Sequence, residues 1–194
     1  MRFSIGSKVV YPYRGPCLIG AVVNRTVAGK PTRFYPLSFL DDSGDAVLIP
    51  VDKFKELPIR YLLAKTEIPK LLRHLESSST AAKNWKQRAI DNDKLLSSGS
   101  AFDLAEIVES LTELSETKAL LPRDRQTLEK AKGFLICEIA EVMAEGRDAA
   151  EGEIDRALKN RRRKLCKGNT VTHRRLQVGL ASGGARSSST PQVR

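Results

Sequence analysis

The N-terminal third of the chain alternates between short runs of β-branched or aromatic residues and clusters of turn-forming residues. The runs cover residues 7–11, 17–23, 33–40 and 46–51, and the clusters of Gly, Pro and Asp between them lie at 13–16, 28–31 and 41–45. This pattern predicts four or five short strands in a small, strongly bent antiparallel β-barrel. Pro36 falls inside the third run and has no amide hydrogen to donate, which predicts an edge or a bulge there.

After Leu62 the apolar residues recur at steps of three and four, which is the period of an amphipathic helix. The predicted helices cover residues 68–75, 83–96, 100–114 and 122–145, and a fifth runs from about 148 to 158. Ser100 with Asp103 resembles a helix-capping box, and Pro122 is tolerated in the first turn of a helix. Gly146 is expected to end the fourth helix. The second module is therefore predicted to be a compact helical bundle.

The expected fold is α+β with three segments: a barrel domain at 1–62, a helical domain at 63–166 and a disordered basic tail at 167–194. The net charge is +10, and residues 159–194 hold ten Lys and Arg residues and no Asp or Glu. Such a segment attracts any polyanion through counterion release. The charge therefore suggests proximity to nucleic acid without identifying a site.

Several classes of protein are disfavoured by the residues present. Cys17, Cys137 and Cys166 are far apart and form no metal-ligand motif, which indicates a reduced, cytoplasmic protein. A membrane-length apolar run and a signal peptide are both lacking. His74 and His173 are the only imidazoles, and no phosphate loop or nucleophile motif accompanies them. We expect a non-enzymatic protein without a cofactor or bound metal.

The most informative segment surrounds the only tryptophan, Trp85. It lies in the stretch Lys83-Asn84-Trp85-Lys86-Gln87-Arg88, whose other members are all polar or charged. A lone Trp in a helical protein is often a core anchor, and that interpretation stays open. The polar neighbours favour a second one, in which the ring stacks on a base or wedges at a base step while cations hold phosphates.

Other basic residues are weaker candidates. Arg123 and Lys130 are seven residues apart, so they share a helix face, whereas Lys132 points elsewhere. Ordinary solvated lysines explain these positions equally well. The run 161–164 is either the fraying end of the last helix or a nonspecific phosphate contact.

Two sets of residues resemble the CarD/CdnL-like family of bacterial transcription regulators. The first is Phe3-x-Ile5-Gly6-Ser7-x-Val9-Val10-Tyr11-Pro12-x-x-Gly15, followed by Arg25-Thr26 and Ile49-Pro50-Val51. The second is Asn84-Trp85, followed by Leu128-x-Lys130-Ala131-x-x-x-Leu135-x-x-Glu138-Ile139-Ala140. The similarity spans about residues 1–158. In this family the barrel is Tudor-like or SH3-like and is shared with the polymerase-interacting domain of the transcription-repair coupling factor.

The resemblance implies a monomeric, cytoplasmic and nucleoid-associated regulator that stabilises the open promoter complex. Its barrel would bind the β subunit of RNA polymerase, and its helical domain would bind promoter double-stranded DNA at the upstream fork of the bubble. The implied DNA-binding residues are Trp85 as a minor-groove wedge, with Lys83, Asn84, Lys86, Arg88, Arg123 and Lys130 around it. The implied polymerase-binding residues are Arg25, Thr26, Leu48 and Pro50.

This chain departs from the family pattern at two places. Some members carry an arginine where Leu48 stands, so an apolar contact would replace a polar one. Gln87, Ala89 and Ile90 stand where cations or an aromatic residue occur in some relatives, which implies a weaker grip on DNA. Two alternatives remain: a general nucleic-acid binder driven by the basic tail, and a protein adaptor in which Trp85 is part of the core.

Overall fold

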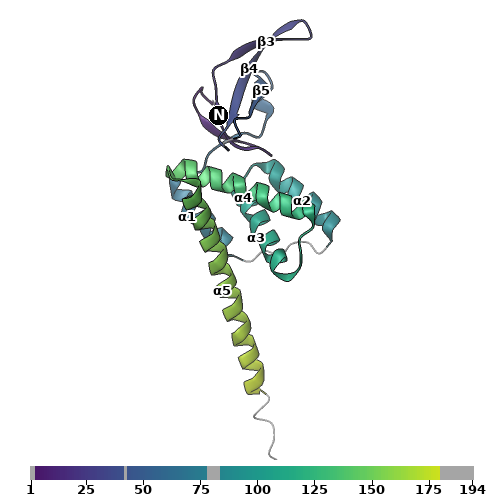
Figure 1. Cartoon of the computed structure of the whole chain (residues 1–194), viewed down its shortest axis with the longest axis vertical. Coiled ribbons are helices and arrows are strands. Elements are labelled where there is room, and N and C mark those ends of the chain that lie inside the picture. Colours follow the sequence, from purple (N-terminus) through teal and green to yellow (C-terminus); the bar gives the residue numbers. More distant parts are fainter. Residues whose placement is uncertain (1–2, 42, 78–83, 180–194) are drawn as a thin grey trace, which may run out of the picture.

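The computed structural model describes residues 3–41, 43–77 and 84–179, without the side chains of 165–179. The strands gather at one end of the molecule and the helices follow them, and the long helix α5 leaves the bundle on the side away from the strands (Figure 1). The strand-rich and helix-rich parts thus form two modules in chain order.

The N-terminal module is an antiparallel sheet of six strands. They are β1 (Lys8–Tyr11), β2 (Gly15–Ile19), β3 (Val23–Val27), β4 (Lys30–Phe39), β5 (Ala46–Pro50) and β6 (Arg60–Tyr61). The strand order is β3-β4-β2-β1-β6, and β5 pairs with β4. Within the described residues these ladders do not close, so the expected closed barrel is not confirmed.

One strand was missed by the sequence pattern. The predicted strand 17–23 is in fact the end of β2 and the start of β3, which runs through the polar segment Val23–Val27 and pairs with β4 from Lys30 to Phe34. Long β4 changes its neighbour from β3 to β2 after Phe34. Pro36 lies at this change and pairs with Leu48 of β5, so its missing amide hydrogen falls where the ladder on one side is interrupted.

The sheet has its own hydrophobic core. Alternation along β4 places Leu37 and Phe39 on the buried face, where they meet Val9, Cys17 and Ile19. A short 3-10 helix at Phe54–Glu56 covers this face with Phe54. Burial raises the pKa of the Cys17 thiol to about 12, so it is kept protonated within this core.

The described residues of the C-terminal module form five α-helices. They are α1 (Ile68–Leu75), α2 (Trp85–Ser98), α3 (Ala101–Thr117), α4 (Pro122–Met143) and α5 (Arg147–Gly179), and a 3-10 turn at Lys65–Glu67 precedes α1. The predicted start signals are confirmed: Ser100 caps α3 by accepting the Asp103 amide, and Pro122 is the first residue of α4. The helix α4 ends at Met143, and its C-cap Ala144 has a left-handed backbone, just before the expected stop at Gly146.

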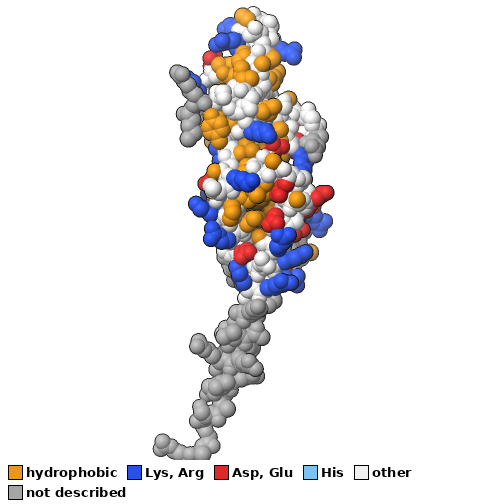
Figure 2. Space-filling view, turned by 90° about the vertical axis from the view of Figure 1, so that its left-hand side faces the viewer, with side chains coloured by type: hydrophobic (Ala, Val, Ile, Leu, Met, Phe, Trp, Pro, Cys, Tyr) orange, Lys and Arg blue, Asp and Glu red, His pale blue; other side chains and the backbone are white. Residues whose placement is uncertain are grey.

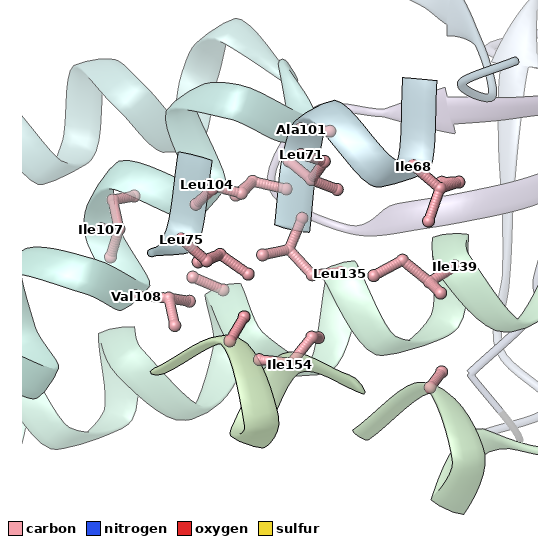
Figure 3. Packing of buried hydrophobic residues seen from close by; sticks show 14 of the residues in the cluster. Ile68, Leu71, Leu75, Ala101, Leu104, Ile107, Val108, Leu135, Ile139 and Ile154 are labelled. Atoms are coloured by element: carbon pink, nitrogen blue, oxygen red, sulfur yellow. The ribbon is translucent and has the colours of Figure 1, made fainter. Parts of the chain in front are cut away.

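The helical core forms where α1, α3, α4 and α5 meet (Figure 3). Leu71 and Leu75 of α1 contact Leu104 and Val108 of α3, while Leu135 of α4 fills the centre. These residues lie at three- and four-residue steps along their helices, as expected for apolar stripes. The helix α2 contributes one buried apolar side chain, Leu96, and its other buried residues, Arg88 and Asn92, are polar. Its packing on the bundle therefore depends also on polar contacts.

The last helix is longer than the sequence pattern predicted. It continues to Gly179, so the predicted boundary at residue 167 does not coincide with the end of the helix. No Pro lies between 147 and 179 to stop it. Residues 180–194 of the predicted disordered tail lie outside the described residues.

The two modules are in direct contact along β2 and α4. Gly15 of β2 has φ of 84°, and a Cβ atom there would lie 2.6 Å from the ring of Phe134 on α4. Glycine therefore permits both the backbone turn and the close approach of the helix. The carbonyl oxygen of Leu40 accepts hydrogen bonds from Cys137 and Arg147, and Lys8 forms an ion pair with Glu141.

A buried ion pair also fixes this junction. The guanidinium of Arg60, at the end of the sheet, donates to both carboxylate oxygens of Glu138 on α4 at 2.6 and 2.8 Å. Glu138 is 1% exposed, and it also accepts the amide of Leu63 at 2.9 Å. Arg60 donates in addition to the Gly99 carbonyl oxygen. The orientation of the modules is therefore set by directional contacts.

Candidate functional site

Trp85 lies at the surface at the start of α2. Its side chain is 53% exposed, which excludes a core position in this conformation. Asn84 is the N-cap of the helix, because its side-chain oxygen accepts the Lys86 amide at 2.9 Å. The Asn-Trp pair thus has a local structural explanation: Asn84 starts the helix, and the next residue is held in its first turn with a defined backbone.

A wide surface hollow of about 540 Å³ opens beside the indole ring. Its lining comprises Trp85, Lys86, Ala89, Ile90, Asp93, Lys94 and Arg123. Trp85 and Ile90 supply exposed apolar surface to the hollow. The Lys86 ammonium lies 5.7 Å from the Trp85 ring centroid, a cation–π geometry. Apolar surface and cations therefore meet in one place, and we call this the Trp85 hollow.

Arg123 reaches the hollow from a different helix, as part of the first turn of α4. Trp85, Lys86 and Arg123 are all predicted from the sequence as DNA contacts, and the structure brings these three residues together. Lys94 is not among the residues predicted from the sequence, although it follows Lys86 by eight residues and Ile90 by four. Helical spacing counted from Lys86, at steps of four and eight residues, places Ile90 and Lys94 on the face of α2 that carries Lys86.

Arg88 has a different position from the one expected. Its side chain is buried, and its guanidinium donates to Asp124 of α4 from Nη2 at 2.5 Å and from Nε at 3.2 Å. It is in line with buried Asn92 and Leu96, at steps of four residues. This position does not support the expected phosphate contact: Arg88 joins α2 to the start of α4, and so holds Trp85 beside Arg123.

Lys130 lies along the α4 face that carries Arg123, at the junction of the modules. Its ammonium is 5.9 Å from the ring centroid of Tyr13 and 5.7 Å from that of Phe134. The Tyr13 hydroxyl in turn donates weakly to Asp93, which lines the Trp85 hollow. One surface thus continues from the hollow to the sheet module. Lys83, the remaining candidate, lies outside the described residues.

Lys132 belongs to the bundle instead. It forms ion pairs with Glu151 and Asp155 of α5 at 2.7 and 2.9 Å. Burial lowers the pKa of Lys132, but the hydrogen bonds to the two carboxylates outweigh it and raise the pKa overall. The prediction that it points away from Lys130 is confirmed.

The residues expected to contact polymerase lie on β3 and β5, the two strands that pair with the long strand β4. The register pairs Arg25 with Thr32, Leu48 with Pro36 and Pro50 with Phe34, all at even positions of β4. Paired residues share a face, so Arg25, Leu48 and Pro50 lie on the face opposite buried Leu37. We call this the outer sheet face. Leu48 is 42% exposed there.

Thr26 differs from its neighbours. It follows Arg25 directly and therefore belongs to the other face of β3. Figure 2 shows hydrophobic side chains on the strand module, with Lys and Arg side chains near its tip. On the same view of the helical module, cations and carboxylates are mixed.

Within the described parts of the chain, no cluster of three or more His, Cys, Asp or Glu side chains could hold a metal ion. None of the described helices has the length and apolarity needed to cross a bilayer. What the structure offers is two exposed surfaces on two modules, held in a fixed orientation by Arg60 and Glu138. These features define a two-module binding protein.

Comparison with known proteins identifies the family. The CarD-like/TRCF RID domain model matches residues 3–62, and the CarD C-terminal domain model matches residues 67–155. The Bacillus subtilis (strain 168) protein “Putative transcription factor YdeB” is 29% identical over 140 residues, which cover 71% of this chain and 90% of that protein. The chain belongs to the CarD-like family, whose members are transcription-associated, RNA polymerase-interacting factors rather than enzymes.

Proposed function

We propose that the protein binds the β subunit of RNA polymerase with its outer sheet face and promoter DNA with the Trp85 hollow, and that it thereby stabilises the open promoter complex. The observation that carries this proposal is the exposed indole of Trp85, set among cations on a braced helix start. A half-exposed Trp leaves apolar area in water that an unstacked base or a widened base step can cover.

The chemistry of the hollow suits a distorted duplex. The cations Lys86, Lys94 and Arg123 line the hollow with the indole ring and with Asp93, and Lys130 extends the basic surface toward the junction. Phosphates positioned by such cations carry no sequence information, whereas the apolar ring favours DNA whose stacking is already broken. The surface therefore prefers the edge of a melted region to intact duplex.

This preference is sufficient to change promoter opening. A ligand shifts an equilibrium by its differential affinity for the two states. A tenfold shift requires a difference in binding free energy of about 1.4 kcal/mol. Stacking of one base on an aromatic side chain contributes about 1–3 kcal/mol, so the indole alone supplies a shift of about 5- to 150-fold. Attachment to polymerase raises the local concentration of the hollow at the fork, so its own affinity for DNA can be weak.

The DNA half of the proposal is tested by affinity for two polymerase–promoter complexes, one opened in advance by a mismatched bubble and one fully paired and closed. Trp85→Ala is expected to weaken binding to the pre-opened complex by at least fivefold and to leave the closed complex unchanged. The control is Ile5→Ala, which removes an equally exposed apolar side chain from the strand module. Equal affinity of Trp85→Ala and the native chain for the pre-opened complex would refute the DNA contact.

The polymerase half is tested by placing one charge on either face of the sheet. Leu48→Glu puts a carboxylate on the outer sheet face, and Thr26→Glu puts it on the opposite face. Binding of the isolated polymerase β subunit is expected to fall at least tenfold with the first variant and to change little with the second. The reverse order would assign the polymerase surface to the other face.

A further inference from the structure

The helix α5 carries charge that the Trp85 hollow does not use. No Asp or Glu follows Asp155 anywhere in the chain, while ten Lys and Arg residues lie between 159 and 194. The CarD C-terminal domain match ends at residue 155. The strongly basic part of the helix therefore begins where the shared family region ends.

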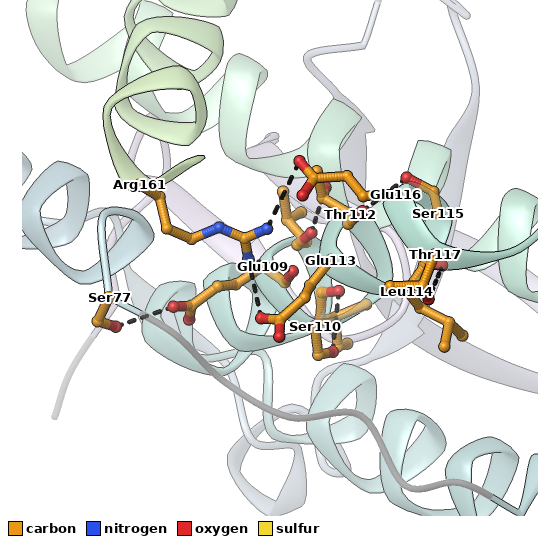
Figure 4. Close-up of polar contacts among 12 residues, drawn as sticks. Ser77, Glu109, Ser110, Thr112, Glu113, Leu114, Ser115, Glu116, Thr117 and Arg161 are labelled. Carbon is orange, nitrogen blue, oxygen red and sulfur yellow. Dashed lines mark hydrogen bonds and ion pairs between the residues drawn. The ribbon is translucent and has the colours of Figure 1, made fainter. Parts of the chain in front are cut away.

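The start of this basic part is fixed to the bundle by buried polar contacts (Figure 4). Arg161 is 1% exposed, and it donates to the main-chain oxygen of Glu109 at 2.8 Å. Its guanidinium also lies 3.6 Å from a carboxylate oxygen of Glu113 and 4.0 Å from one of Glu116. These contacts tie α5 to α3, so the helix leaves the bundle in a defined direction.

A second contact fixes α5 to the end of α1. Glu76 accepts from Asn160 at 3.1 Å and forms an ion pair with Lys164 at 2.5 Å. Both bonds, together with a coulombic contribution from Lys164, lower the pKa of Glu76, so its carboxylate stays charged near neutral pH. Beyond Lys164 the helix continues to Gly179 and extends away from the other helices (Figure 1).

Half of the ten Lys and Arg residues of α5 share one side of the helix. At 100° per residue, five of them fall within about 80° of one another: Arg156, Lys159, Arg163, Lys167 and Arg174. The buried residues Ile154, Ala157 and Arg161 lie on the opposite side. Arg156, Lys159 and Arg163 are exposed and therefore belong to the face directed away from the bundle. Helical spacing continues the row to Lys167 and Arg174, and at 1.5 Å per residue the row is about 27 Å long. We call it the α5 cation row.

We propose that the α5 cation row binds the phosphate backbone of double-stranded DNA, as a second nucleic-acid surface separate from the Trp85 hollow. A straight row of cations on a helix matches the regular phosphates of a duplex. Binding of single strands usually depends on aromatic platforms, and α5 contains no Phe, Tyr or Trp. The row reads no sequence and requires neither polymerase nor a melted bubble.

The test uses linear, fully paired DNA without polymerase, and compares two full-length variants with the same net charge. The row variant carries Arg163→Gln, Lys167→Gln and Arg174→Gln. The control carries Lys30→Gln, Lys53→Gln and Lys70→Gln, at three exposed positions elsewhere. Affinity is measured between 50 and 200 mM salt, where each lost phosphate contact lowers the slope of log K against log salt by about 1.

The row variant is expected to lower that slope by about 2 to 3 and the control to leave it near the native value. Equal changes in both variants would assign binding to total charge and overturn the proposal. An unchanged row variant would overturn it too, as would an equal loss on single-stranded RNA. Trp85→Ala is expected to leave binding to this paired DNA unchanged, so failure of the row does not affect the proposed role of the hollow.

Discussion

Breaking the Arg60–Glu138 pair tests whether the two modules act as one unit. The pair crosses the junction, and replacement of either partner by Met leaves the other charge without its counterion. Glu138 is almost completely buried, and the side chain of Arg60 is 26% exposed. Removal of one partner of a buried pair costs about 3 to 5 kcal/mol. We expect Glu138→Met to lower the free energy of unfolding by about 3 kcal/mol, because water reaches part of Arg60. Arg60→Met is expected to cost the upper part of the range.

The double variant separates the charge pair from mere loss of packing. With both side chains replaced by Met no unpaired charge remains, and buried ion pairs exchanged for apolar residues often cost little. The Leu63 amide loses its acceptor, which costs about 1 to 3 kcal/mol. The double variant is therefore expected to lose less stability than Arg60→Met alone.

Urea unfolding followed by circular dichroism, with a near-ultraviolet signal for each module, measures these values. The native chain is expected to unfold in one transition, because the junction couples two small cores. Single variants are expected to separate the two transitions. If the costs of the single changes simply added in the double variant, the pair would not be coupled and the account of the junction would be wrong.

Three further variants or reactions test other parts of the structure. Arg88→Met is expected to destabilise the protein by about 3 kcal/mol, because it leaves buried Asp124 unpaired; reduced DNA affinity with unchanged stability would instead return Arg88 to the DNA surface. The Cys17 thiol, with its pKa near 12, is expected to react with a thiol reagent at pH 8 only after unfolding, and prompt reaction in the folded state would show that its core is open. Burial raises the pKa of Glu109 above its ordinary value near 4.5, so its contribution to stability is full at lower pH and is lost as pH rises through the folded value. Glu109→Gln is therefore expected to gain stability relative to the native chain as pH rises to neutral in denaturation series, and a constant difference would contradict the assignment.

The helices could be predicted from the sequence because each has a buried stripe at helical spacing. Ser100 and Pro122 mark their starts by local chemistry that tertiary contacts do not override. The strand β3 could not be predicted, since its residues Val23–Val27 are largely exposed and carry no alternation. β3 and β4 form a long hairpin at the edge of the sheet, and main-chain hydrogen bonds stabilise it.

The site was predictable in part. The exposure of Trp85 could be predicted from its polar neighbours, and the Asn84-Trp85 motif predicted its role in DNA binding. The buried position of Arg88 could not be predicted, because closeness to Trp85 in sequence does not specify which face of α2 meets the bundle. Its partner Asp124 is 36 residues away. Glu138 is part of the family motif, but the sequence does not specify that its partner across the junction is Arg60.

The proposal that Trp85 stabilises the open promoter complex is tested most directly by the lifetime of that complex. The lifetime is measured after addition of a competitor, in the presence of saturating native protein or saturating Trp85→Ala. The native protein is expected to prolong the lifetime at least fivefold. Trp85→Phe is expected to retain part of this effect and Trp85→Ala little of it, while all three bind the polymerase β subunit equally. Equal lifetimes with the native protein and Trp85→Ala would show that the exposed indole does not act on promoter DNA.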